Sequence, residues 1–301
     1  MQPIFDSELL AWRRRRALAR AAPGADFLMA RAADELGERL AAVQRIFAKA
    51  AALFCVTPAA RDAVLASGKA QHVLRVEADA AFLGDDEGVV GMPGHIPLDP
   101  QSVDLAVSLL SLHDENDVLG MLIQIRRALR PDGLFLGTML GGGTLGELRE
   151  SLLAAEMELL GGASPRVSPF ADVRDGGALL QRAGFALPVA DVDTLTVRYA
   201  SPWQLLADLR AMGAANALLA RLRRPATRGL FARADEIYRQ RFSDPDGRVR
   251  ATFSFVWLSG WAPDPSQPKP LKPGSANVSL AKILGEAGGG KIGRASCRER
   301  V

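Results

Sequence analysis

Apolar residues recur at helical spacing over the first part of the chain, from about Asp6 to Ala48. Positions three or four apart predict one buried helix face, formed by Leu36, Leu40, Val43, Ile46 and Phe47. Pro23-Gly24 interrupts the pattern, so two consecutive helices are expected here.

The middle of the chain alternates short apolar runs with amphipathic segments. The expected strands are 52–56, 72–76, 103–112 and 134–139, and the expected helices are 58–66 and 116–129. Thr57 is a good N-cap and Pro58 suits the first helical position, so the first of these helices should begin there. A loop rich in Gly, Asp and Pro separates the second and third runs, and Arg130-Pro131-Asp132-Gly133 predicts a turn.

The second half predicts helices followed by long strands. Helices are expected over 144–160, 173–183, 202–212 and 227–242, with an irregular segment over 161–170 and strands over 185–199 and 251–261. Alternating strands and helices imply right-handed crossovers, hence a doubly wound α/β fold with a mainly parallel sheet and a C-terminal antiparallel pair. Ligands of such sheets bind beyond the carboxyl ends of the strands. The candidate site therefore lies in the loops after Val56, Val76 and Leu112.

The last eleven residues, 291–301, do not read like the rest of the chain. They can be written codon for codon as read-through into a common short-read sequencing adapter, and a genuine basic tail is the alternative. They contain four basic residues and one acid, so without them the formal charge of +3 falls to zero. The pI near 9.1 then no longer argues for a nucleic-acid partner.

Composition narrows the class of protein. With 48% hydrophobic and 24% charged residues among 301, the chain is neither disordered nor fibrous. Its two cysteines are too few for a disulfide framework or a four-cysteine zinc site, and Cys55 is expected to pack as a small apolar residue. His72 and His95 have no spaced partners, so no metal is expected.

The same sequence predicts a cytoplasmic protein. No apolar run approaches the ~18 residues of a membrane helix, and the start of the chain lacks the pattern of a secretory signal. No stable membrane insertion is therefore expected. The run Arg13 to Arg16 is interpreted either as a phosphate-binding patch or as a solvated helix face, and the second is favoured because no other basic cluster lies nearby.

Several motifs resemble one known family. The matching residues are Ile4-Phe5-Asp6, Val103-Asp104-Leu105, Ser111-Leu112-His113 with Asn116-Asp117, Arg130-Pro131-Asp132-Gly133, Gly141-Gly142 with Thr144-Leu145, Glu147-Leu148-Arg149, Gly161-Gly162 with Ser164-Pro165, Ser168-Pro169-Phe170, Arg182-Ala183-Gly184-Phe185, Gly260-Trp261 and Gly274-Ser275-Ala276. The chain resembles the class I S-adenosylmethionine-dependent methyltransferases, most closely the branch of the arginine-hydroxylase that is complex I assembly factor 5, and its bacterial relatives. The resemblance covers nearly all of residues 1–285.

The resemblance implies a Rossmann-like sheet of seven strands and S-adenosylmethionine as the cofactor. It also implies a protein partner, either a protein substrate or a subunit of NADH dehydrogenase. The expected organisation is a helical lead over 1–48, a methyltransferase-like domain over 49–262, a C-terminal extension over 263–290 and the adapter-derived residues 291–301.

The cofactor loop of this family reads Asp-x-Gly-x-Gly-x-Gly after the first strand. Aligned without gaps, this chain has Phe54 in place of the acid and Val56, Pro58 and Ala60 in place of the glycines. Glycine lets backbone N–H groups approach a ligand and adopts positive φ angles, whereas proline removes an N–H donor. Thr57 remains as the expected cap of the following helix.

The resemblance also assigns further contact residues. Glu77 stands where an acid receives the ribose hydroxyls, and a solvated acid at a strand end is the alternative. Met92 stands near the adenine position and either packs on the ring or fills core, with core favoured. Ser111 and His113 follow the buried strand. His113 is either a general base or pocket wall, or a hydrogen-bonded structural histidine.

Two functional hypotheses follow. The first is a methyltransferase-family enzyme that modifies a protein side chain, by methylation or, as in the arginine-hydroxylase, by hydroxylation. The second is a pseudoenzyme, a methyltransferase scaffold kept as an assembly factor that no longer binds S-adenosylmethionine. Fold alone does not decide between them, because function resides in the site.

Overall fold

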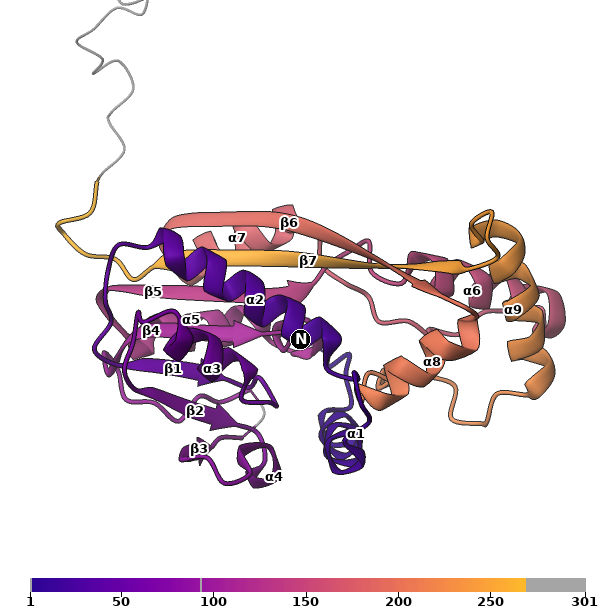
Figure 1. The fold of residues 1–301 in the computed structure, drawn as a ribbon, viewed down its shortest axis with the longest axis horizontal. Helices are drawn as coiled ribbons and strands as arrows, with labels where there is room; N and C mark the ends of the chain where they lie inside the picture. The colour runs from indigo at the N-terminus through magenta and orange to yellow at the C-terminus, as the bar shows by residue number, and fades with distance from the viewer. Residues whose placement is uncertain (1, 93, 269–301) are drawn as a thin grey trace, which may run out of the picture. The chain divides into compact units, whose positions relative to one another are not determined.

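Seven strands form one sheet in the order β3-β2-β1-β4-β5-β7-β6 (Figure 1). The strands are β1 (Ala50–Leu53), β2 (Val73–Glu77), β3 (Gly88–Val90), β4 (Val103–Leu109), β5 (Leu129–Leu140), β6 (Ala186–Tyr199) and β7 (Val249–Trp261). The first five strands of the chain pair in parallel, and β7 runs antiparallel to both β5 and β6. This is the predicted doubly wound sheet with its C-terminal antiparallel pair.

This computed structural model describes residues 2–92 and 94–268. Residues 1–264 form one compact unit. The expected tail over 291–301, with Cys297, and most of the expected extension over 263–290 lie outside the described residues. The division at residue 48 and the other predicted boundaries stay predictions.

Helices cover both faces of the sheet. They are α1 (Ser7–Arg20), α2 (Phe27–Ala42), α3 (Ala59–Ala66), α4 (Ala80–Leu83), η1 (Leu112–Asp114), α5 (Val118–Ala128), α6 (Gly146–Leu160), α7 (Val173–Ala183), α8 (Pro202–Ala211) and α9 (Arg228–Phe242). One buried cluster packs α2 and α3 on the sheet and also includes side chains of α6, α8 and α9. The other packs α5 and α7. In Figure 1, β6 and β7 continue toward α6, α8 and α9.

The N-terminal pattern is confirmed in outline. α1 and α2 are separate helices, and Leu36 and Leu40 are completely buried. However, α2 ends at Ala42, so Val43, Ile46 and Phe47 follow it in extended chain. Ile46 is 73% exposed, which contradicts its assignment to the buried face.

Three further expectations are wrong in detail. The expected loop between the second and third apolar runs contains α4 and β3, which are too short to give a periodic signal. The expected turn at Arg130–Gly133 lies inside β5, where the register with β4 shifts and Asp132 adopts a φ of 60°. The helix after β1 has Pro58 as its N-cap residue, with no capping hydrogen bond from a side chain.

Candidate functional site

The loops after β1, β2 and β4 meet at one edge of the sheet. In parallel sheets this carboxyl edge is where ligands bind. Four of the five predicted site residues follow or end these strands and Met92 follows β3, but the five do not converge on one cavity. Their individual positions decide what the edge can bind.

The β1–α3 loop keeps a backbone that favours glycine. Phe54 has φ 55° and Val56 has φ 63°, both in the left-handed region where a β-branched residue such as valine is an outlier. Val56 aligns with a glycine position of the family loop, and its backbone angle agrees with that alignment. A side chain held in this region costs on the order of 1–3 kcal/mol.

Replacing Val56 with glycine should therefore stabilise the fold by about 1 kcal/mol, because relief of the strained φ outweighs the added freedom of the unfolded chain. Urea denaturation measures the change. Val64→Gly is the matched control: Val64 lies buried inside α3, and its replacement should destabilise the protein. A Val56→Gly variant that loses as much stability as Val64→Gly would contradict the strain.

Glu77 is sealed inside the protein and is fully buried. Its Oε1 accepts a hydrogen bond from Arg75 Nη2 at 3.0 Å, and its Oε2 accepts one from the Val56 N–H at 3.1 Å. The carboxylate is not solvated, as one interpretation of Glu77 required. It is also not open to a ribose, as the other required, because it is buried and both of its oxygens already accept hydrogen bonds within the protein. Burial raises the pKa of Glu77 to about 7, although Val56 and Arg75 oppose the change.

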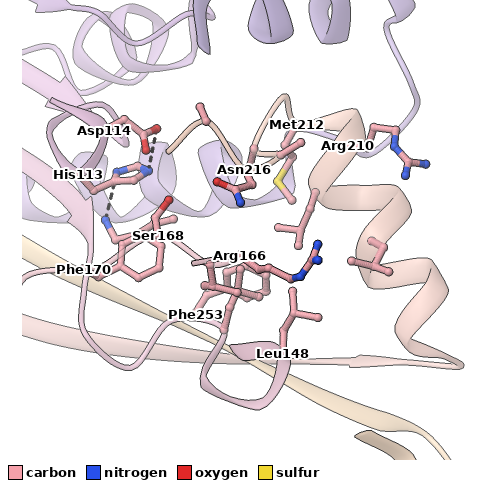
Figure 2. Close-up of a pocket in the computed structure, with 18 of the residues that line it drawn as sticks. His113, Asp114, Leu148, Arg166, Ser168, Phe170, Arg210, Met212, Asn216 and Phe253 are labelled. Carbon is pink, nitrogen blue, oxygen red and sulfur yellow. Dashed lines mark hydrogen bonds and ion pairs between the residues drawn. The ribbon is translucent and has the colours of Figure 1, made fainter. Parts of the chain in front are cut away.

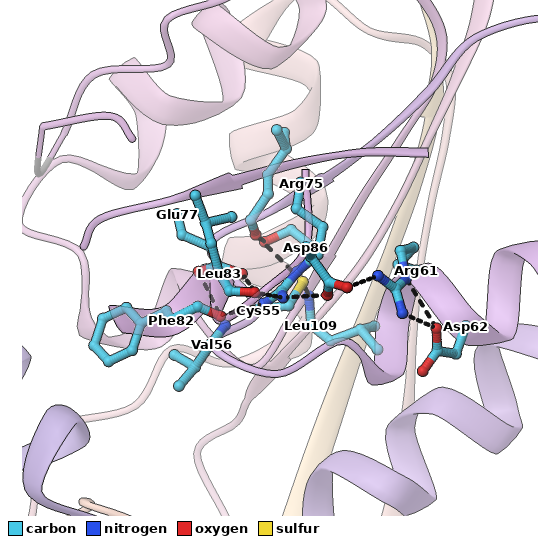
Figure 3. A network of polar contacts seen from close by, with 12 residues as sticks. Cys55, Val56, Arg61, Asp62, Arg75, Glu77, Phe82, Leu83, Asp86 and Leu109 are labelled. Atoms are coloured by element: carbon cyan, nitrogen blue, oxygen red, sulfur yellow. Dashed lines mark hydrogen bonds and ion pairs between the residues drawn. The ribbon is translucent and has the colours of Figure 1, made fainter. Parts of the chain in front are cut away.

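Arg75, on the same strand, pairs with the buried carboxylate of Glu77 and shields it from solvent (Figure 3). Its side chain is 1% exposed. Its guanidinium donates to Asp86 Oδ2 at 2.8 Å and to the backbone oxygens of Phe82 and Leu83. Asp86 also pairs with Arg61. The end of β2 is therefore a closed charge network, which we call the Arg75–Glu77 network.

The raised pKa of Glu77 predicts a pH dependence. Because the pKa of about 7 in the folded protein lies above the ordinary glutamate value of 4.5, the folded protein binds more protons than the unfolded chain between these pH values. Relative to the non-titrating variant Glu77→Gln, the wild-type free energy of unfolding should therefore be greatest below pH 4.5 and should fall as pH rises through 7. Denaturation of both proteins across this range measures the effect. A wild-type stability that rises relative to Glu77→Gln over the same range would contradict it.

Three other predicted contact residues are Met92, Ser111 and Thr57. Met92 and Ser111 line neither of the two cavities at this edge, and the Thr57 hydroxyl lacks a hydrogen-bond partner among the described residues. Met92 is 69% exposed, so the favoured core assignment is wrong. Ser111 is buried and bonds Ser108 Oγ at 2.8 Å. The Thr57 hydroxyl is buried and has no hydrogen-bond partner among the described residues, so it does not cap α3.

His113 is held at the edge by two contacts. Its Nδ1 accepts the N–H of Leu140 at 3.4 Å, and its Nε2 lies 3.4 Å from Asp114 Oδ2. Burial lowers its pKa, which Asp114 partly offsets. These contacts match the structural alternative for His113, while its ring still forms part of a cavity wall.

The arginine run of α1 is only partly a solvated face. Arg14 pairs with Asp114 at 2.7 Å, and Arg13 donates to the backbone oxygens of Ala215 and Asn216. Arg15 and Arg16 are exposed. The expectation of a solvated helix face is therefore wrong for Arg13 and Arg14, whose partners lie about 200 and 100 residues away in sequence, respectively.

Two neighbouring cavities open at this edge, with volumes of about 450 and 240 Å³. They share the wall residues Leu28, His113, Asp114, Leu140, Met212 and Ala214. The larger cavity lies against Val56 and Thr57 and the turn between α1 and α2. The side chains of Glu77, Met92 and Ser111 line neither cavity.

The 161–170 segment, singled out by its motif, closes the smaller cavity (Figure 2). Glu156 of α6 is buried and bonds the N–H and hydroxyl of Ser164, each at 2.8 Å, and it pairs with Arg166 at 2.6 Å. Phe170 lies against the His113 ring, with centroids 5.9 Å apart. Sequence reasoning missed Glu156, although an acid at a helix position facing the core was a possible signal.

The part of the chain that the structure describes holds neither a metal-binding cluster nor a membrane-crossing helix. No group of three His, Cys, Asp or Glu side chains is placed to hold a metal ion in residues 2–92 and 94–268. Among the helices described, none combines the length and apolar character needed to cross a membrane.

Comparison with known proteins agrees with this architecture. The methyltransferase domain family matches residues 63–137. Over 188 residues the chain is 43% identical to the mitochondrial arginine-hydroxylase NDUFAF5 of Danio rerio and 42% identical to that of Homo sapiens; each match covers 62% of this chain. These matches cover 58% and 54% of the relatives, so the chain spans little more than half of their length.

More distant proteins share the domain or the fold. The malonyl-[acyl-carrier protein] O-methyltransferase of Halorhodospira halophila is 36% identical over 166 residues, covering 55% of this chain and 54% of the relative. A protein from Bacillus halodurans described as a methyltransferase superimposes with a TM-score of 0.53 at 13% identity, covering 77% of this chain and 99% of the other. This structural likeness shows the fold alone.

Proposed function

We propose that this chain, which belongs to the class I S-adenosylmethionine-dependent methyltransferase superfamily and lies close to NDUFAF5, acts without that cofactor as an assembly factor for a respiratory NADH dehydrogenase. The partner comes from the similarity to NDUFAF5, a complex I assembly factor. The cofactor independence comes from the site. A cytoplasmic location is part of the proposal, whereas the matched NDUFAF5 proteins are mitochondrial.

The burial of Glu77 within a hydrogen-bonded network is the main observation that supports the proposal. An acid that receives two ribose hydroxyls must present an accessible side of its carboxylate to the ligand, since each oxygen accepts up to two hydrogen bonds. Both oxygens of Glu77 already accept hydrogen bonds, and the residue is fully buried. Binding a nucleoside there would require displacing Arg75, whose own side chain is 1% exposed. Such displacement would leave a buried charge without its partner, which is strongly unfavourable.

The neighbouring loop supports the same conclusion. Val56 carries a branched side chain where the family has glycine, and its N–H donates inward to Glu77. Pro58 has no N–H to offer. The residues present therefore do not fit S-adenosylmethionine in the usual position. Gly143, where the family has a carboxylate, removes a further acid from the neighbouring loop.

One observation favours the alternative, an enzyme that modifies a protein side chain. The cavities lie at the carboxyl edge of the sheet, and His113 with its neighbour Asp114 forms part of both walls. NDUFAF5 is named as an arginine-hydroxylase. Under this alternative His113 would be the first candidate for a general base.

The test separates assembly from catalysis. In a host that assembles NADH dehydrogenase but lacks its own copy of this protein, the chain should restore the assembled complex, and it should be recovered with NADH dehydrogenase subunits. Mass spectrometry should find no methyl group or oxygen atom that depends on the chain. Failure to restore assembly would contradict the assembly role. A chain-dependent modification that His113→Ala abolishes would instead support the enzyme.

A further inference from the structure

The larger cavity is a formed space that the Arg75–Glu77 network does not fill. Its volume of about 450 Å³ lies within the range of small-molecule sites. Most of its wall is apolar, formed by residues such as Ala17, Leu18, Leu28, Met29, Val56 and Leu110. A wall of this kind favours a ligand that removes apolar surface from water.

The charged groups in this wall are already neutralised or exposed. Arg14 and Asp114 pair with each other at 2.7 Å, and their side chains are 19% and 16% exposed. Asp26 is exposed to solvent. His113 receives the Leu140 N–H on one nitrogen and faces Asp114 with the other. Away from Asp26 at the exposed rim, a ligand with a net charge would therefore lose hydration without meeting an unpaired opposite charge.

One polar group in the wall lacks a partner. The Thr57 Oγ1 atom is buried and has no hydrogen bond among the described residues, and Thr57 lines this cavity. A buried hydroxyl without a partner is unfavourable by roughly 1–3 kcal/mol. Because this oxygen has almost no accessible surface, rotation of the Thr57 side chain about χ1 would be needed to bring it to a single hydroxyl or carbonyl group of a ligand.

We propose that this cavity binds an uncharged, mainly apolar small molecule that carries one hydrogen-bonding group, next to Thr57. This inference extends the proposed function, because it assigns to the carboxyl edge a ligand other than a charged nucleoside. Entry is through the turn between α1 and α2, where Ala21, Pro23, Gly24 and Asp26 are exposed wall residues.

Four probes of one shape test the ligand class. They are 2-naphthalenemethanol, naphthalene, 2-naphthoate and the 2-naphthylmethylammonium ion, measured by equilibrium dialysis against the full chain at neutral pH. The alcohol should bind at least about tenfold more tightly than either ion. Thr57→Val should weaken binding of the alcohol and leave binding of naphthalene unchanged. Equal binding of all four probes, tighter binding of either ion, or no binding of the alcohol would overturn the proposal.

Filling the cavity locates the site. Ala17→Leu and Ala22→Leu each replace a methyl group in the wall by an isobutyl group and should weaken binding of the alcohol at least about tenfold. Ala30→Leu is the matched control, because Ala30 is exposed on α2 and does not line the cavity. Circular dichroism confirms that each variant is folded. If both filling variants bind as wild type does, the probe binds elsewhere and the proposal fails.

The same dialysis measurement distinguishes failure of the lipophilic site from failure of the proposed function. Lack of alcohol binding would overturn the lipophilic site and leave cofactor independence untouched. Displacement of the alcohol by S-adenosylmethionine would overturn cofactor independence and the preference of the cavity for uncharged ligands, although the alcohol would still bind there.

Discussion

Glu77→Ala should lower the free energy of unfolding by about 3–5 kcal/mol, which is the usual loss when one member of a buried ion pair is removed. Arg75 would keep Asp86 and two backbone oxygens but would lose its buried partner at 3.0 Å. Chemical denaturation at pH 7 measures the change. This is the largest effect expected from a single substitution at the sheet edge.

Two variants control this prediction. Glu87→Ala removes an exposed acid and should change stability by less than about 0.5 kcal/mol. Replacing both members, Arg75→Met with Glu77→Leu, should lose less than Glu77→Ala because no charge is left buried. A Glu77→Ala variant as stable as Glu87→Ala would mean that the Arg75–Glu77 network is open in solution, and the site would then accommodate a ribose.

Glu156→Ala should have the second largest effect, a loss of about 2–4 kcal/mol together with release of the 161–170 segment. The carboxylate satisfies the Ser164 N–H, the Ser164 hydroxyl and the Arg166 guanidinium at once, and its side chain is 1% exposed. Losing it leaves these donors without their shared acceptor. Denaturation gives the stability change, and limited trypsin digestion should show faster cleavage after Arg166.

The matched control for this variant is two residues along the same helix. Glu158 pairs with Arg233 at 2.6 Å, but its side chain is 48% exposed. Surface pairs of this kind contribute about 0–1 kcal/mol, so Glu158→Ala should leave both stability and cleavage near wild type. Equal behaviour of the two variants would contradict the anchoring role of Glu156.

The sequence predicted the fold well because the apolar periods are strong. The buried strand after residue 102 and the alternation of strands and helices suffice to predict a doubly wound sheet. Short elements escaped, since α4 and β3 span only four and three residues. At Arg130–Gly133, residues typical of a turn lie inside β5, and the strand resumes its pairing with β4 after them.

The candidate site was predictable only in part. Glu77 was located correctly, and the pairing with Arg75 had a signal, because residues two apart on a strand share a face. The contact of Arg14 with Asp114 had no signal in the sequence, since 100 residues separate the two. Exposure of Met92 depends on the path of a loop, which periodicity does not describe.

We expect this methyltransferase-fold chain not to bind S-adenosylmethionine. Calorimetric titration with S-adenosylmethionine and S-adenosylhomocysteine tests it most directly, with the Val56→Gly, Pro58→Gly, Ala60→Gly variant alongside. We expect no detectable heat of binding for the wild-type chain. A dissociation constant below roughly 100 μM, about −5.5 kcal/mol, for the wild-type chain would contradict the claim.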